Sequence, residues 1–191
     1  MSTLKRRGTP QGDKKEYENL ANGEYEGRLT YVADLGMQAR EYKGEVKSPC
    51  QQLSLGIEIL GEHVKIGEEE VPRVLWTKPF NIYFVMNEKG NEFKLYRVFD
   101  STAQEGEEAD WDSVLGTPCS VVVGKDAKTN TYDEIVTLNP IPAKYRKDVA
   151  AGELDPAIGD ADDMDNPANK AMFGLVKYVY DKRILDVDIP F

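Results

Sequence analysis

Apolar and polar residues alternate in five stretches of the chain, which is the pattern of strands that bury one face. In the first stretch Tyr25, Leu29 and Leu35 fall on one face, while Glu24 and Arg28 fall on the other. A glycine in its middle permits a sharp bend or the close approach of another backbone. The predicted strands cover residues 23–35, 51–60, 71–77, 118–124 and 132–138.

The spacing of the apolar residues changes from that of a strand to that of a helix between the third and fourth predicted strands. Apolar residues recur at helical spacing between residues 87 and 100, and Asn87 is a suitable cap for the first turn. The apolar members of this predicted helix are Phe93, Leu95, Tyr96, Val98 and Phe99. Residues 79–85 are apolar and aromatic, and their Phe80 and Tyr83 are candidates for the core. A polar, acidic loop is expected over residues 101–112.

The predicted order is therefore three strands, a helix and two strands. This order predicts a mainly β fold, a five-stranded Greek-key barrel of the OB type with one helix between its strands. OB barrels bind single-stranded nucleic acid across their second and third strands and the adjacent loops. Strand order alone does not fix the topology, so another small barrel or sandwich of about five or six strands stays open as an alternative.

Three regions of the chain differ in composition. Residues 1–18 are predicted to form a basic flexible arm and residues 19–142 the OB-fold domain. Residues 143–191 are predicted to form an acidic linker, a short helix and a C-terminal tip. Asn166 followed by Pro167 is a helix-start signal, and the apolar stripe behind it can dock on the barrel or mediate a homodimer.

Composition limits the classes of protein to consider. The 191-residue chain has a net charge of −10, and 40% of its residues are hydrophobic. No apolar run approaches the ~18 residues of a membrane helix, and the basic N-terminal residues lack the apolar region of a secretory signal. With His63 as the only histidine, Cys50 and Cys119 cannot form a four-ligand zinc site without carboxylates. We therefore expect a soluble, reduced, cytoplasmic protein without membrane contact.

Motifs for catalysis are lacking in the sequence. The histidine has no serine or cysteine partner motif, and there is no P-loop or dinucleotide fingerprint. The acidic run from Asp160 superficially resembles a calcium loop but lacks the glycine and the glutamate that such a loop requires. We therefore expect no enzyme activity, no cofactor and no metal.

The distribution of charge bears on nucleic-acid binding. Residues 1–15 carry five basic groups and one acidic group, so the rest of the chain is more acidic than the total indicates. An acidic body repels phosphate on average, and only a local basic face allows nucleic-acid binding. Such binding is expected to be modest in affinity and sensitive to salt.

Binding to single strands without sequence preference needs aromatic rings for stacking and cations that follow the backbone. The sequence offers such groups in a loop over residues 36–49, along the third predicted strand and on the outward face of the first. The candidates are Arg28, Arg40, Tyr42, Lys43, Lys47, Arg73, Trp76 and Lys78. In an OB barrel these places are neighbours. Trp76 is as well suited to a core or rim position, and Glu41 and Glu45 weaken the positive charge of the loop.

The chain ends on an aromatic ring, a terminal carboxylate and flanking acidic side chains. Pro190 favours an extended backbone at Ile189, so Phe191 ends a short stiff arm suited to a basic pocket with an apolar floor. The predicted partner-binding tip is Asp186, Asp188, Ile189, Pro190 and Phe191. It resembles the acidic tip through which bacterial single-stranded-DNA-binding proteins recruit replication and repair partners. The alternative is a frayed terminus that ends on phenylalanine by chance.

A second resemblance covers residues 23–142. Its motifs are Gly-Glu-Tyr-Glu-Gly-Arg-Leu (23–29), the Asp34-Leu35-Gly36 turn, the strand over 53–59, Leu-Gly-Thr-Pro-Cys-Ser-Val (115–121) and residues 132–142. Together they are similar to OB-fold single-stranded-DNA-binding proteins of bacteriophages. The resemblance implies a protein of DNA replication, recombination and repair that coats exposed single strands without catalysis, in the host cytoplasm.

The negative charge leaves a different function open. An acidic protein-interaction module, or a DNA mimic, would bind a basic site on a replication or host-defence protein. A contiguous basic and aromatic groove across the second and third strands would favour DNA binding, whereas an acidic groove would favour the mimic.

Overall fold

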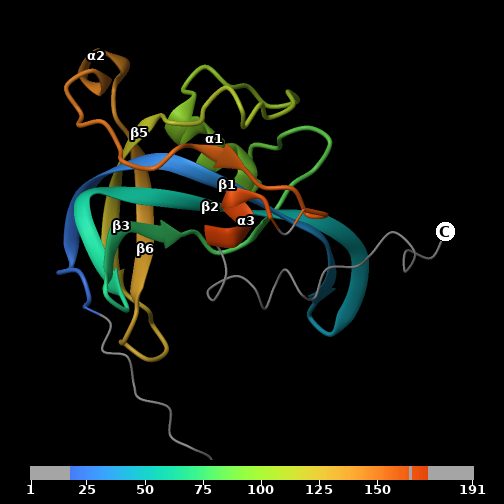
Figure 1. Ribbon diagram of the computed structural model, residues 1–191. Coiled ribbons are helices and arrows are strands. Elements are labelled where there is room, and N and C mark those ends of the chain that lie inside the picture. The colour runs from blue at the N-terminus through green and yellow to red at the C-terminus, as the bar shows by residue number, and fades with distance from the viewer. Residues whose placement is uncertain (1–17, 164, 172–191) are drawn as a thin grey trace, which may run out of the picture.

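The computed structural model describes residues 18–163 and 165–171 (Figure 1). Over these residues the fold is mainly β, as predicted, with seven strands and three short helices. The long strands are β1 (Gly23–Tyr42), β2 (Glu45–Ile66), β3 (Glu69–Trp76), β5 (Pro118–Lys125) and β6 (Asp133–Pro140). The two-residue strands are β4 (Phe80–Asn81) and β7 (Ala157–Ile158), and the helices are α1 (Asn91–Phe99), α2 (Ala143–Arg146) and α3 (Pro167–Ala171). The sequence predicts only the long strands.

The strands form one sheet in the order β3-β2-β1-β5-β6. β4 is antiparallel to β2, and β7 is parallel to β1. In the described part of the chain, backbone pairing stops at β3 and β6, yet side chains join these two edges. Arg73 Nη1 lies 2.8 Å from Asp133 Oδ2, and Lys78 pairs with Glu134. The sheet is curved in Figure 1. The two ion pairs connect its edges.

β1 and β2 continue past their predicted ends and form a hairpin arm, residues 37–51, that projects from the sheet (Figure 1). The sequence predicts a loop here, but the strands stay paired as far as Tyr42 and Glu45. The turn residues Lys43 and Gly44 have φ of 53° and 80°, the left-handed conformations that a two-residue hairpin turn requires.

The predicted turn over residues 61–70 is likewise mostly strand. β2 and β3 pair out to Ile66 and Glu69, which leaves Gly67 and Glu68 for the turn. Toward their turns both extensions are narrow ribbons with two solvated faces, although Gln38 and Cys50 at the base of the arm are buried. Their sequences therefore lack the alternation that marks a half-buried strand, and the loop predictions are wrong for this reason.

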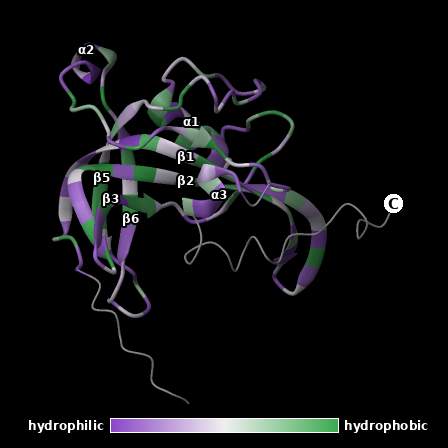
Figure 2. Ribbon diagram, in the orientation of Figure 1, coloured by the Kyte–Doolittle hydropathy of each residue, from purple (hydrophilic) through white to green (hydrophobic). Residues whose placement is uncertain are grey.

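The core lies on the inner face of the sheet, where Leu29 and Ile57 are fully buried and Phe80 is buried as expected. Hydrophobic and hydrophilic residues alternate along these strands in Figure 2. Gly27 allows β1, β2 and β5 to approach closely, because a Cβ there would lie 2.5 Å from Val121 Cγ2 and 2.8 Å from a methyl of Ile57.

α1 packs its apolar side against this core and begins later than predicted. The helix starts at Asn91 behind Gly90, and not at Asn87. Asn87 closes a turn instead, because its side-chain Oδ1 accepts Lys89 N at 2.9 Å and its carbonyl accepts Gly90 N at 2.7 Å. Its hydrogen bonds are therefore made in a turn four residues before the first residue of the helix.

The predicted acidic linker is folded against the sheet over part of its length. Through β7 it pairs with β1, and Gly159 N donates to Val32 O. α3 begins at the predicted signal, where Asn166 Oδ1 accepts Ala168 N at 2.9 Å. The predicted basic arm lies outside the described residues apart from Glu18. The predicted tip, Asp186, Asp188, Ile189, Pro190 and Phe191, lies outside them as well.

Candidate nucleic-acid interface

The predicted binding residues fall in two separate regions. Arg40, Tyr42, Lys43 and Lys47 lie on the hairpin arm, where Arg40 and Lys47 are cross-strand partners. The others are in the body of the sheet, on β1 or on β3 and the residues that follow it: Arg28, Arg73, Trp76 and Lys78. The structure brings the first four residues together and leaves the other four apart from them.

The arm forms one side of a groove with a volume of about 470 Å³, which we call the arm groove. This volume is within the range of about 300–1,000 Å³ that is usual for small-molecule sites. The arm contributes Arg40, Tyr42 and Lys47, and the body of the sheet contributes Gln52 from β2 and Asn81 from β4. Three of the predicted binding residues thus line a single concave surface.

Tyr42 is the aromatic group of this groove. Its side chain is 62% exposed, so the ring does not belong to the core. Lys43 Nζ lies 5.3 Å from the ring centroid, a cation–π distance. A ring that lines a groove and carries a neighbouring cation suits both stacking on a base and contact with its phosphate.

The charge of the arm is positive but partly neutralised. Lys47 Nζ is 2.6 Å from Glu45 Oε2, and Glu41 also lines the groove. Exposed ion pairs such as this one contribute about 0–1 kcal/mol and are screened by salt. An incoming phosphate can therefore compete with Glu45 for Lys47, and binding to the arm is expected to weaken with salt.

An exposed aromatic loop, residues 82–85, follows β4 at the base of the arm. Tyr83 is 51% exposed and Phe84 87% exposed, so the prediction of a core position for Tyr83 is wrong. The loop is fixed to the arm, because Ile82 N donates to Gln51 O at 2.9 Å and Cys50 Sγ donates to Ile82 O at 3.0 Å. Two rings thus stand at the surface beside Asn81 of the groove.

Sequence reasoning missed this loop although the signal was present. Residues 82–85 are four apolar residues in a row, followed by a buried Met86. A strand with one buried face cannot bury consecutive side chains, so some of the four had to be exposed.

Glu92, in the first turn of α1, contacts the same loop through its side chain. Its side chain is buried, and its Oε2 accepts Tyr83 N at 3.4 Å. Burial raises the pKa of the Glu92 carboxyl, although the hydrogen bond from Tyr83 N acts to lower it. The backbone of the aromatic loop is therefore tied to a titratable group.

Arg28 and Arg73 are held by carboxylates inside the molecule. Arg28 Nη2 is 2.8 Å from Oε2 of the buried Glu58 and also donates to Leu154 O. Arg73 is only 6% exposed and pairs with Asp133. The prediction that Arg28 faces solvent is wrong, and neither guanidinium is available to a phosphate in this structure.

Trp76 stacks on Tyr31, with ring centroids 6.0 Å apart and planes 11° apart. It also covers Gly56, where a Cβ would lie 2.9 Å from Trp76 Cη2. Burial raises the pKa of Tyr31, and the nearby carboxylates of Glu58 and Asp155 raise it further. The two carboxylates near the ring pair, which Arg28 partly offsets, do not favour a nucleic-acid strand there.

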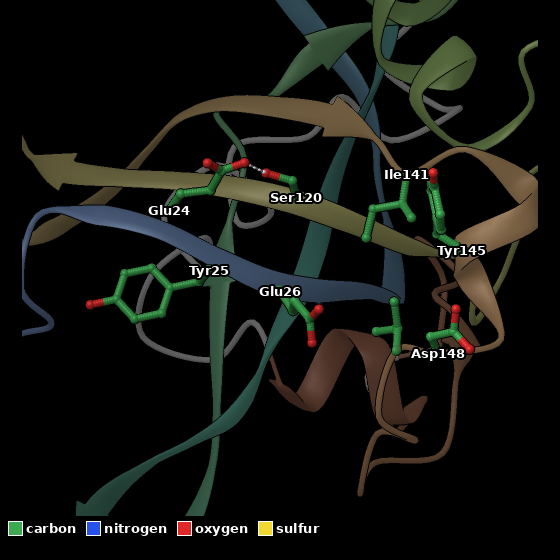
Figure 3. A pocket seen from close by; sticks show the side chains of 8 residues that line it. Glu24, Tyr25, Glu26, Ser120, Ile141, Tyr145 and Asp148 are labelled. Carbon is green, nitrogen blue, oxygen red and sulfur yellow. Dashed lines mark hydrogen bonds between the residues drawn. The ribbon is translucent and has the colours of Figure 1, made fainter.

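A second groove, of similar volume, is acidic (Figure 3). It lies where β1 and β5 meet the segment around α2, and Glu24, Glu26 and Asp148 line it together with Tyr25 and Tyr145. In Figure 3 Glu24 is turned toward Ser120, whose Oγ donates to its carboxylate. This surface suits a cationic group and repels phosphate.

Neither metal chemistry nor membrane insertion has a structural candidate within residues 18–163 and 165–171. No group of three or more His, Cys, Asp or Glu side chains there is placed to hold a metal ion, and no helix there is long and apolar enough to cross a membrane. The chain matches no protein-family model, no curated protein and no solved structure.

Proposed function

We propose that this protein binds single-stranded DNA without sequence preference, through the hairpin arm and the aromatic loop beside it. One observation carries the proposal: Arg40, Tyr42 and Lys47 line a single groove, and two exposed rings follow its lining residue Asn81 closely in sequence. Cations and stacking rings on one surface are the two requirements of sequence-neutral binding to a single strand.

Each group has a separate role in this proposal. Arg40, Lys43 and Lys47 contact successive phosphates, and Tyr42, Tyr83 and Phe84 stack on bases. Every base has a π-face, so stacking tolerates any sequence. A duplex keeps its bases stacked on one another, so these rings discriminate against it.

The topology supports an OB-type barrel. The five long strands follow the order β3-β2-β1-β5-β6, the helix α1 comes before β5, and ion pairs join β3 to β6. A partly open five-stranded Greek-key barrel has this character, and its loop between the first two strands is one of the loops that contact ligands. In this chain that loop is the hairpin arm.

The biological role follows from the resemblance of the residues to phage and bacterial proteins. In this proposal the protein coats exposed strands during phage DNA replication, recombination and repair, in the host cytoplasm. The predicted tip, residues 186–191, recruits partner proteins. No chemical step is required of the protein.

The direct test is fluorescence anisotropy with a labelled single strand of about 30 nucleotides and the matching duplex, at low and moderate salt. The wild type should prefer the single strand. The double variant Lys43→Glu/Lys47→Glu should bind it about tenfold or more weakly. The slope of log K against log salt concentration should also be about 1.4 less steep for this variant, since two phosphate contacts are removed.

A matched control makes the same change in charge elsewhere. Lys144 and Lys147 lie in and after α2, which is at the opposite end of the molecule from the arm in Figure 1. Lys144→Glu/Lys147→Glu should bind about as well as the wild type, with an effect limited to long-range screening. Equal losses in the two double variants, or no binding by the wild type at low salt, would refute the proposal.

The acidic groove favours a second candidate function, the binding of a basic site on a replication or host-defence protein. Glu24, Glu26 and Asp148 would bind Lys or Arg side chains there, and two tyrosines would contact their alkyl chains. Glu24→Lys/Glu26→Lys should abolish such binding and leave DNA binding by the arm intact or improved. A loss of DNA binding in this variant would contradict both assignments.

A further inference from the structure

We propose that the arm groove is a subsite for one unpaired nucleobase, whose hydrogen-bonding edge meets the side-chain amides of Gln52 and Asn81. The inference rests on the proposed function and makes it more specific. It assigns to two residues, neither of which carries charge or an aromatic ring, a second part in the selection of single strands over duplex, beside that of the rings.

The two amides form a pair on the wall of the groove. Gln52 and Asn81 are cross-strand partners on β2 and β4, and Gln52 Nε2 donates to Asn81 Oδ1 at 2.9 Å. Both residues are half-buried and line the groove with Tyr42 and the two cations. Backbone pairing already holds β4 on β2, at Leu53 with Phe80 as well, so the amide pair is not the only link between these strands.

This pair keeps hydrogen-bonding capacity that the described residues do not use. Gln52 Oε1 can accept, and Asn81 Nδ2 can donate, without a partner in the described part of the chain. The pair thus presents an acceptor beside a donor. If both amides are rotated by 180°, the order is reversed but a donor still stands beside an acceptor.

A donor beside an acceptor is also what each base presents on its Watson–Crick edge. Adenine and cytosine offer an exocyclic amine next to a ring nitrogen, and guanine and thymine offer a ring N–H next to a carbonyl oxygen. An amide pair that can adopt either order therefore fits all four bases. In a duplex the same edge is paired with the opposite strand and cannot reach the groove.

The other lining residues complete a nucleotide site. Tyr42 provides an exposed ring in the groove, and Arg40 and Lys47 stand as a cross-strand pair for the phosphates on either side of this nucleotide. The arm and the sheet therefore contact different parts of the same nucleotide: the arm its base face and phosphate, and the sheet its base edge.

The test compares two labelled single strands of about 30 nucleotides, an oligothymidylate and the same strand with N3-methylthymine at every position. The N3-methyl group removes the ring N–H and blocks the base edge, while charge and stacking area are retained. The wild type should bind the methylated strand about threefold to tenfold more weakly. Gln52→Ala/Asn81→Ala should bind unmodified strand as weakly as the wild type binds the methylated one, and should no longer distinguish the two.

Further variants keep the test decisive. Asn81→Asp retains the acceptor for Gln52 but cannot donate to a base carbonyl oxygen, so it should bind the unmodified strand more weakly even if the double alanine variant is poorly folded. Asn139→Ala, an exposed amide on β6, is the control and should behave as wild type. Thermal unfolding of each variant by circular dichroism verifies the fold.

The outcomes separate the two proposals. Equal binding of both strands by the wild type, with Lys43→Glu/Lys47→Glu still weakened, would overturn the base-edge subsite and leave single-strand binding intact. Failure of the wild type to bind either strand would overturn both.

Discussion

The hairpin arm and the body of the sheet contain the same kinds of residue in different surroundings. Each region has arginine, lysine and a large aromatic ring. On the arm, Arg40 and Tyr42 line an open groove. On the sheet, Arg28 is bound to a buried Glu58, and Trp76 is stacked on Tyr31.

The difference between the regions lies in their acidic partners. Arg28 pairs with a carboxylate 30 residues away, and Arg73 with one 60 residues away. Both carboxylates are shielded from water, so these ion pairs have a structural role. The acidic neighbours of the arm, Glu41 and Glu45, are exposed and can yield to a phosphate. A basic residue is thus available to a ligand only where its competing carboxylate is solvated.

The largest effect in this comparison is expected from two arginine substitutions. Arg28→Ala leaves Glu58, with 2% of its side chain exposed, without its cation and should cost about 3–5 kcal/mol of unfolding free energy. Arg40→Ala should change stability by less than about 0.5 kcal/mol but weaken binding to single-stranded DNA. Urea denaturation measures the unfolding free energy of each variant, and fluorescence anisotropy measures its affinity for single-stranded DNA. A stable Arg28→Ala variant with impaired DNA binding would reverse our assignment of the two regions.

A smaller loss of stability is expected from Gly56→Ala. The added methyl group would meet the Trp76 ring at 2.9 Å and Tyr31 Cβ at 3.0 Å, so the stacked pair must shift. Overpacking of this kind costs about 1–3 kcal/mol. Trp76 fluorescence should change with it, whereas affinity for single-stranded DNA should not, because the arm is untouched. Parallel losses of stability and affinity would show that Trp76 takes part in binding after all.

These two regions also show what the sequence could predict. The strands with one buried face were predictable, because alternation reports burial directly. The four arm residues were predictable as a group, since they lie within eight positions of one another. The pairing of Gln52 with Asn81 was not predictable, because Asn81 lies on β4, and a two-residue strand has no period to detect. The burial of Arg28 and Arg73 was hidden for a related reason: it depends on carboxylates that only the folded chain brings near.

The aromatic loop gives a test that depends on pH. The folded-state pKa of Glu92 is raised above its ordinary value of 4.5 by burial, so ionisation of this group opposes folding. Its favourable contribution is present below pH 4.5 and is lost as pH rises through the folded-state pKa. Glu92→Gln should therefore be more stable than wild type at pH 7, with a difference that shrinks toward pH 4. Thermal melts of the variant and the wild type at pH 7 and pH 4 measure this difference in stability. A difference that does not change with pH would argue against burial of Glu92 as its cause.

The smallest effect is expected where the 152–159 segment meets the sheet through an exposed pair. Glu153 Oε1 is 2.9 Å from His63 Nε2, but more than half of the Glu153 side chain is exposed. Glu153→Ala should therefore cost no more than about 1 kcal/mol. The backbone N–H of residue 153 still donates to Glu58, and β7 still pairs with β1, so the segment should stay in place. Hydrogen exchange at Gly159, whose N–H donates to Val32 O, should remain as slow as in the wild type. Fast exchange there would mean that the surface pair, and not the buried bonds, holds the acidic segment against β1.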